Sequence, residues 1–380
     1  MWKKLRKILL VLLVIIIIAV IIAGALFWRW QRQMSSMTLE ERLEQTMADI
    51  AKAENCGAFF NIYRASDGFS WQSGWNGQTA DTPYPITSIT KMYTAAVIMC
   101  LAEEGALKLD DPLALYMEPD LLAGLHVLNG RDYSGEITIR HLLGHTSGLP
   151  DTTEGESGAS YMQKIRNWQD VTYDLNDILE HTKQLTPHFA PGEPGRAWYT
   201  DTNYQLLGVV IEKASGFALA DAYDHYLFAP LGLQNTYLQI SPTTWKVAPV
   251  CHDGRYLQIP GVVFSERSAG GIISTAADSM VFLKAFFAGE LFPKERLAEM
   301  QNWRDLQFYP VQYGLGLVRA VPPGPFNLPR YEIIGHTGFL GSMSYYCPAR
   351  DIYITGTVCD LDSKRALIAV YRMLICFDFP

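Results

Sequence analysis

The hydropathy pattern begins with an uncharged apolar run from Ile8 to Trp28. Its 21 residues match what an α-helix needs to cross a hydrocarbon core of roughly 30 Å. Basic residues are denser before the run than after it, so residues 1–7 are expected in the cytoplasm and the remainder outside. A cleaved signal peptide is the alternative, because Ala23-Gly24-Ala25 fits a small-x-small cleavage pattern. The length of the run favours an uncleaved anchor at residues 8–28.

Residues 29–55 are predicted to form a juxtamembrane linker and a first helix. Thr38 and Glu41 have the spacing of a capping box. Apolar residues then recur at helical spacing: Leu39, Leu43, Met47 and Ile50. A helix that leans on the next domain fits this pattern, and a coiled-coil stalk would need a longer run.

Residues 56–380 are predicted to form one domain, with strand-like patterns at both ends and helices and long loops between them. Two aromatic-rich runs around a turn at Asp67-Gly68 predict a hairpin, and a helix closes the chain at Ser363–Cys376. The expected strands are 58–63, 69–75, 313–319, 331–334, 342–347 and 352–358. This order indicates an α+β fold with an antiparallel sheet flanked by helices and a large helical insertion.

The polar stretch from Asp151 to Ser160 reads as a loop. It could border a cleft, or it could be a solvated insertion. Within it, residues 155–159 nearly match a G-x-S-x-G nucleophile elbow. No strand precedes them and the last glycine is missing, which argues against that interpretation.

Charge narrows the possible partners. Beyond residue 35 the chain has 25 basic and 39 acidic residues, a net charge of −14. Such a surface does not suit nucleic acid and does not attract anionic substrates over long range. The six cysteines lack metal-site spacing, and one disulfide of unreadable pairing is possible. No metal and no cofactor are predicted.

The candidate chemistry begins at Ser88-Ile89-Thr90-Lys91, at the head of an apolar helical run. Residues three apart share a helix face, so the Lys91 amine can reach the Ser88 hydroxyl. A serine hydroxyl is a weak nucleophile without an adjacent base. A lysine can be that base only when its amine is partly neutral.

Two further motifs lie far from Ser88: Tyr199-Thr-Asp201, and His336-Thr-Gly338 after an apolar strand. With S-x-x-K they resemble the signature of the serine β-lactamase and penicillin-binding-protein superfamily. The resemblance is to its class C-like branch of D,D-peptidases, esterases and β-lactamase-related hydrolases. It runs from about Ala58 to the C-terminus. Three other stretches resemble that branch: 103–112, 141–150 and 268–275.

The resemblance implies a β-lactamase/transpeptidase-like fold with the active site between the sheet and the helical part. It implies Ser88 as the nucleophile, with Lys91 and Tyr199 handling the proton. The N–H groups of Ser88 and Phe339 would bind the oxyanion. Thr337 and Gly338 would contact the substrate along a strand edge. Which of Lys91 and Tyr199 accepts the proton stays open.

Two residues depart from the family pattern and affect substrate binding. Asp201 replaces a common asparagine, and an ionised carboxylate only accepts hydrogen bonds. Beside Lys91 it would favour the charged amine and shift the role of base towards Tyr199. His336 replaces the lysine of K-T-G, and a neutral imidazole attracts a substrate carboxylate less than an ammonium does. Both changes argue against efficient β-lactamase action.

A zinc site at His141 and His145 is disfavoured because no H-E-x-x-H glutamate or third ligand is nearby. These histidines are expected to support a turn in the helical part. A penicillin-sensing receptor is disfavoured because only seven residues precede the apolar run.

The sequence therefore predicts an exported, membrane-anchored serine hydrolase with a small-molecule or cell-wall peptide substrate. The expected substrate is a small ester or a D-amino-acid peptide, as for D,D-carboxypeptidases and esterases. A β-lactamase and a non-catalytic cell-envelope scaffold remain as alternatives. The oligomeric state is not readable from the sequence.

Overall fold

The computed structural model describes every residue except 1, 55–56, 152–162, 309–310, 322–330 and 380. Its largest element is an eight-stranded antiparallel sheet in the order β10-β11-β12-β13-β14-β15-β1-β2. In chain order the strands are β1 (Phe59–Arg64), β2 (Phe69–Gly74), β10 (Arg304–Asp305), β11 (Val311–Tyr313), β12 (Val318–Ala320), β13 (Ile333–Thr337), β14 (Ser342–Cys347) and β15 (Ile352–Thr357). The predicted α+β class is confirmed.

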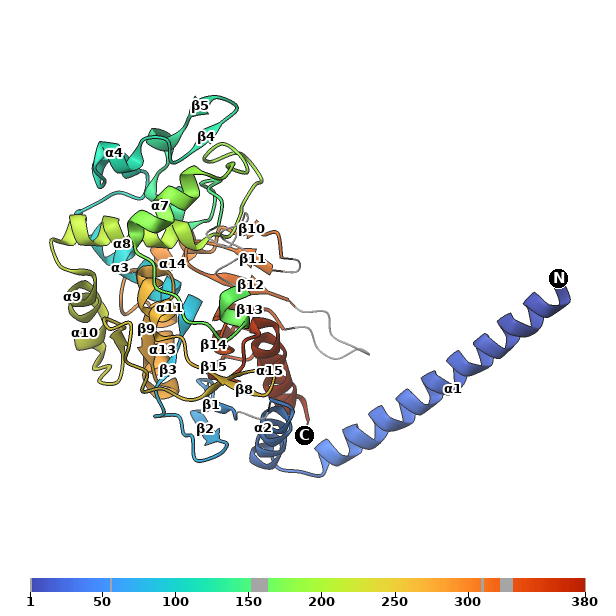
Figure 1. The fold of residues 1–380 in the computed structure, drawn as a ribbon. Coiled ribbons are helices and arrows are strands. Elements are labelled where there is room, and N and C mark those ends of the chain that lie inside the picture. The colour runs from blue at the N-terminus through green and yellow to red at the C-terminus, as the bar shows by residue number, and fades with distance from the viewer. Residues whose placement is uncertain (1, 55–56, 152–162, 309–310, 322–330, 380) are drawn as a thin grey trace.

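Helices cover both faces of this sheet, so its central strands bury both sides (Figure 1). Successive side chains of a strand point to opposite faces. Phe59 accordingly joins the core shared with α3 (Thr90–Glu103) and α13 (Ala276–Ala288). Phe60 joins the core shared with α2 (Leu39–Glu54) and α15 (Ser363–Ile375).

The chain between β2 and β10 builds the helical part. Besides α3 and α13, the α-helices described in this part are α4 (Pro119–Leu122), α5 (Ile139–Leu143), α7 (Leu175–Lys183), α8 (Asp201–Ser215), α9 (Leu219–Tyr223), α10 (Ala229–Leu231), α11 (Pro260–Ser265), α12 (Arg267–Gly270) and α14 (Lys294–Met300). Short strands, which the sequence analysis did not anticipate, also occur here. They are β3 (Tyr84–Pro85), β4 (Val127–Leu128), β5 (Arg131–Asp132), β6 (Tyr237–Leu238), β7 (Val250–His252), β8 (Arg255–Leu257) and β9 (Ile272–Ser274).

Several local predictions are confirmed. β1 and β2 form the expected hairpin, and α15 begins at the expected Ser363. Thr38 and Glu41 form the capping box, with Thr38 N–H donating to Glu41 Oε2 at 2.9 Å and Glu41 N–H donating to Thr38 Oγ1 at 3.2 Å.

One expected strand is wrong: residues 313–319 do not form a continuous strand. β11 ends at Tyr313 and β12 begins at Val318. Gly316 lies between them with φ of 81°, a left-handed conformation that glycine adopts without strain. Gly314 N–H also donates to the carbonyl of Leu317 at 2.8 Å. The two strands are therefore joined by a tight turn.

The N-terminal apolar run lies in one helix, α1 (Trp2–Ser35), which projects away from the rest of the molecule (Figure 1). Leu12–Ser35 is long and apolar enough to cross a membrane by length and composition. The end of α1 packs on the rest of the molecule. The Trp30 ring meets Phe379 edge-on at 5.3 Å, and Met34 is buried.

Candidate active site

Ser88 lies in a tight 3-10 turn, Thr87–Ile89, immediately before α3. The preceding Thr87 is buried with φ of 46°, a rare conformation for a β-branched residue. Ser342 Oγ donates to the carbonyl of Ile86 at 2.7 Å and ties the turn to the start of β14. The surrounding structure thus holds a strained turn in place, a common feature of functional sites.

Gly338 brings the H-T-G segment against this turn. A Cβ added there would lie 1.7 Å from Thr87 Oγ1 and 2.6 Å from the carbonyl oxygen of Ile86. Neither the Ser88 N–H nor the Phe339 N–H has a hydrogen-bond acceptor among the described residues. Both N–H groups are therefore free to donate a hydrogen bond to a ligand at the point where the Ser88 turn meets the end of β13.

Lys91 reaches Ser88 as the i,i+3 spacing predicts. Its Nζ donates to Ser88 Oγ at 3.2 Å, to Asp201 Oδ1 at 2.5 Å and to the carbonyl of Ala269 at 2.8 Å. Burial is the largest single effect and lowers the pKa of the amine. The charges of Asp201, Tyr199 and Glu266, together with the hydrogen bond to Asp201, outweigh it, so the net pKa is raised. Lys91 is thus an ammonium whose three hydrogens are all used.

Tyr199 completes the cluster from the segment before α8. The Lys91 Nζ lies 5.0 Å from the centre of its ring. Burial raises the pKa of Tyr199, and the charge of Lys91 opposes this without overcoming it. Tyr199 is therefore a neutral phenol in the resting site.

Gln307 holds the backbone of Tyr199, a contact that no sequence motif signals. Its Oε1 accepts the Tyr199 N–H at 3.0 Å, and its Nε2 donates to the Tyr199 carbonyl at 3.2 Å. The neighbouring Phe308 is 56% exposed, with its ring centre 6.4 Å from that of Tyr199. The loop after β10 thus adds an apolar wall beside the cluster.

His145 contacts the segment that carries Tyr199. Its Nδ1 accepts the Thr200 N–H at 3.2 Å, and its ring centre lies 4.4 Å from that of Tyr199. His141 instead caps α5, where its Nδ1 accepts the Thr138 N–H at 3.3 Å. Both contacts fit the expectation that these histidines support a turn in the helical part. The position of His145 next to Tyr199 was not expected, although His145 lies in the family-like stretch 141–150.

His336 lies on β13 and is 3% exposed. Its Nδ1 donates to the Thr337 carbonyl at 2.8 Å, and its Nε2 lies 3.2 Å from the Tyr313 hydroxyl. Burial and the charge of Lys91 lower the pKa of His336 to about 3. The imidazole is therefore neutral and engaged within the protein, while Thr337 and Phe339 are half-buried at the surface of the site.

Two further carboxyl groups, those of Asp151 and Glu266, lie near the ion pair of Lys91 and Asp201. Asp201 is the first residue of α8, and its N–H donates to Asp151 Oδ2 at 2.7 Å. Glu266, just before α12, accepts a short hydrogen bond from the Tyr173 hydroxyl. Burial raises the pKa of Glu266 to about 8, with Asp201 adding to the effect and Lys91 opposing it.

Part of the 151–160 loop lies outside the described residues, including the G-x-S-x-G-like segment.

This pKa predicts how stability depends on pH. Folding raises the pKa of Glu266 from its ordinary value of 4.5 to about 8. Between these two values the folded state binds more protons than the unfolded state. The free energy of unfolding therefore falls as pH rises through this range. Relative to Glu266→Gln, the wild type should lose about 2 kcal/mol of unfolding free energy between about pH 5.5 and about pH 8.5, after discounting for the partial exposure of the side chain. Urea unfolding of both proteins in detergent measures the difference.

Glu290→Gln, at an exposed position on the surface, is the control and should follow the wild type at every pH. A Glu266→Gln protein whose unfolding free energy parallels the wild type across this range would contradict the assignment.

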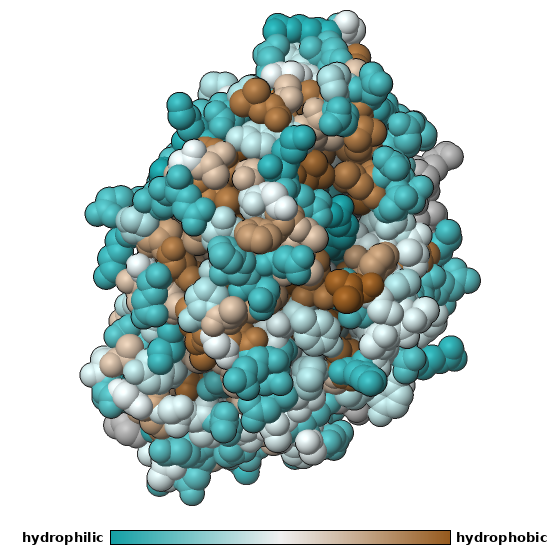
Figure 2. Space-filling model, turned by 90° about the vertical axis from the view of Figure 1, so that its left-hand side faces the viewer, coloured by the Kyte–Doolittle hydropathy of each residue, from teal (hydrophilic) through white to brown (hydrophobic). Residues whose placement is uncertain are grey.

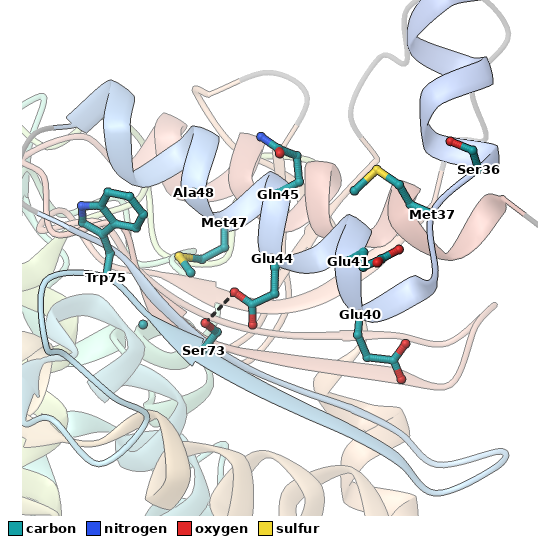
Figure 3. Close-up of a pocket in the computed structure, with 11 residues that line it drawn as sticks. Ser36, Met37, Glu40, Glu41, Glu44, Gln45, Met47, Ala48, Ser73 and Trp75 are labelled. Atoms are coloured by element: carbon teal, nitrogen blue, oxygen red, sulfur yellow. Dashed lines mark hydrogen bonds between the residues drawn. The ribbon is translucent and has the colours of Figure 1, made fainter.

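A separate open groove lies between α2 and the edge strand β2 (Figure 3). Glu40, Glu41 and Glu44 face it from α2, and Glu44 Oε2 accepts from Ser73 Oγ at 3.0 Å. None of the predicted site residues lines this groove.

On the face drawn in Figure 2, apolar patches are separated by hydrophilic side chains, as on an ordinary water-facing surface.

Comparisons with known proteins place these residues in a family. Residues 61–370 match the Beta-lactamase family model. The chain is 34% identical to penicillin-binding protein 4* of Bacillus subtilis over 46% of this chain and 35% of that protein. It is 30% identical to esterase EstB of Burkholderia gladioli over 57% of this chain and 52% of that protein. The chain thus matches about a third to a half of the length of these curated relatives.

The fold has close counterparts among solved structures. A D-stereospecific amidohydrolase from Streptomyces superposes with a TM-score of 0.69 at 26% identity, covering 87% of this chain and 98% of that one. The similarity therefore extends over the sheet and the helical part together.

Proposed function

Because the chain belongs to the Beta-lactamase family of serine hydrolases, we propose that it cleaves a small ester or a D-amino-acid amide or peptide through an acyl-enzyme. The observation that carries the proposal is the contact of the buried Lys91 ammonium with Ser88 Oγ at 3.2 Å. A hydroxyl that accepts a hydrogen bond from a buried cation is stabilised as it becomes an alkoxide.

In the proposed mechanism, Ser88 Oγ attacks the substrate carbonyl while the N–H groups of Ser88 and Phe339 hold the oxyanion. Lys91 is already protonated, so it acts as an electrostatic stabiliser. Tyr199 accepts the Ser88 proton as a phenolate and returns it to the leaving group. Water then hydrolyses the acyl-enzyme and frees Ser88.

Supporting positions are assigned from their contacts. Asp201 fixes Lys91 and borders the substrate, and Thr337 and Gly338 line the strand edge. His336 acts indirectly, since both of its ring nitrogens are engaged inside the protein. A buried neutral His336 gives no charge to bind a substrate carboxylate, which argues against β-lactamase action.

We further propose that α1 anchors the enzyme in the cell membrane with the catalytic part on the extracytoplasmic side. The length and hydropathy of Leu12–Ser35 support the span. Cys251 is disulfide-bonded, and disulfides persist mainly in oxidising compartments. The substrate would then be a small molecule or a peptide of the cell wall.

The assignment of Tyr199 as base predicts the pH profile. Since the pKa of Tyr199 is raised above its usual 10, the phenolate fraction grows about tenfold per pH unit across the neutral range. For p-nitrophenyl acetate, kcat/KM corrected for background should rise with pH without a plateau up to about pH 9. The measurement is a pH–rate series on the full chain in detergent.

Tyr199→Phe should lower kcat/KM at least about 100-fold and remove the rise. Tyr353→Phe, on the central strand β15, is the matched control and should keep the wild-type profile. A plateau below pH 8 in the wild type, or a pH rise that survives in Tyr199→Phe, would contradict the role of Tyr199.

A further inference from the structure

Asp201 offers one carboxylate oxygen to the substrate. Its Oδ1 is bound to Lys91, while its Oδ2 has no partner among the described residues. The Asp201 side chain is 22% exposed, whereas that of Lys91 is fully buried. The accessible charge of this ion pair is therefore negative.

The basic side chains next to Asp201 do not offer a free positive charge to balance its carboxylate, because each is either bonded inside the protein or neutral. Within the described part of the chain, Lys91 is the cation that contacts Ser88 or Asp201, and all three of its hydrogens are donated inside the protein. Burial lowers the pKa of both His145 and His336, so neither imidazole is charged at neutral pH.

Two more carboxyl groups lie near Asp201, but neither adds a cation that could balance its charge. Asp151 accepts the N–H of Asp201, and Glu266 lies close enough to both aspartates that their charges raise its pKa. With its pKa raised to about 8, Glu266 is mostly protonated at neutral pH, so the accessible charge near Ser88 is that of the partly exposed Asp201 carboxylate. A second positive charge near Asp201 would be favourable, and a negative one would be repelled.

The position of Asp201 defines where that charge would sit. Ser88 Oγ lies 3.2 Å from Lys91 Nζ, and Nζ lies 2.5 Å from Asp201 Oδ1, so the carboxylate is within 5.7 Å of the nucleophile. An amino group on the carbon next to the scissile carbonyl falls within this range when Ser88 contacts the carbonyl carbon.

We propose that Asp201 binds the free ammonium of an α-aminoacyl substrate, so that this enzyme cleaves amides or esters of unblocked amino acids. The inference rests on the proposed function and specifies its substrate class. In the reaction, Ser88 Oγ bonds to the aminoacyl carbonyl carbon as the bond to the leaving group breaks. The Ser88 proton passes to that leaving group, and water releases the free amino acid.

Substrates that carry a carboxylate near the scissile bond would be poor, because Lys91, the cation that contacts Ser88 and Asp201, already donates all three of its hydrogens inside the protein. This distinguishes the inferred activity from a carboxypeptidase, which must hold a terminal carboxylate. The expected preference for a substrate with a free ammonium comes from the negative charge of Asp201. An asparagine at this position is neutral and would not provide it.

The experiment compares two substrates that differ only in the amine: D-alanine p-nitroanilide and its N-acetyl derivative. The full chain in detergent should give a kcat/KM at least about tenfold higher for the free amine, which corresponds to about 1.4 kcal/mol. In Asp201→Asn this ratio should fall to about one, whatever happens to the absolute rates. The ratio is diagnostic because a change in Lys91 or in folding affects both substrates alike.

Asp221→Asn, which removes an exposed carboxylate on α9, is the control and should keep the wild-type ratio. A wild-type ratio near one, with p-nitrophenyl acetate still hydrolysed, would overturn the inference and leave the proposed function standing. A high ratio that persists in Asp201→Asn would overturn the role of Asp201. If the folded protein hydrolyses none of these compounds and no fluorophosphonate adduct forms, the proposed function fails and the inference fails with it.

Discussion

Replacement of Ser88 by alanine is expected to abolish covalent labelling by a fluorophosphonate and to lower esterase turnover by at least about 1,000-fold. The reason is that the hydroxyl is the atom that Lys91 Nζ contacts at 3.2 Å, and its removal leaves the ammonium, the phenol and the N–H pair without a nucleophile. Intact-mass spectrometry of the full chain should show one adduct in the wild type and none in Ser88→Ala. The substitution adds no volume, so the fold should be retained.

Ser70→Ala is the matched control, since Ser70 is exposed on β2, and it should label like the wild type. An adduct that persists in Ser88→Ala would show that another residue is the activated nucleophile. A folded wild-type protein that takes up no label would contradict the hydrolase mechanism, and a scaffold role in the cell envelope would become the better explanation.

The parts of the fold that could be predicted are those specified by neighbouring residues. The β1–β2 hairpin follows from two aromatic runs around Asp67-Gly68, and the cap of α2 follows from Thr38 and Glu41. The contact of Ser88 with Lys91 likewise follows from helix geometry alone. In each case a few consecutive side chains decide the local structure.

The contacts that could not be predicted join segments far apart in the chain. Gln307 binds the backbone of Tyr199 across 108 positions, and no pattern around Gln307 marks it. Glu266 acquires its raised pKa from burial beside Asp201 and Asp151. The sequence supplied the identity of His336 but not its burial, and burial is what excludes a charged imidazole.

Substitution of Gly338 by alanine is expected to disable the site although no reacting atom is removed. The added Cβ would lie 1.7 Å from Thr87 Oγ1, 2.2 Å from Ser342 Oγ and 2.6 Å from the Ile86 carbonyl oxygen. A rotation of Thr87 relieves only the first of these contacts, so the turn that carries Ser88 must move away from β13. A displacement of about 1 Å is enough to lower kcat/KM about 100-fold, and overpacking should cost about 1–3 kcal/mol of stability.

The test separates displacement of the nucleophile from loss of the fold. Gly135→Ala is the matched control, because a Cβ there meets nothing within 4 Å, and it should leave both rate and stability unchanged. Urea unfolding should show that Gly338→Ala still folds cooperatively, while p-nitrophenyl acetate turnover and the rate of fluorophosphonate labelling fall together. Both rates report on the position of Ser88, so their parallel loss in a folded protein would identify the turn as the element that moved. Wild-type rates in Gly338→Ala would instead mean that β13 and the Ser88 turn do not approach each other this closely.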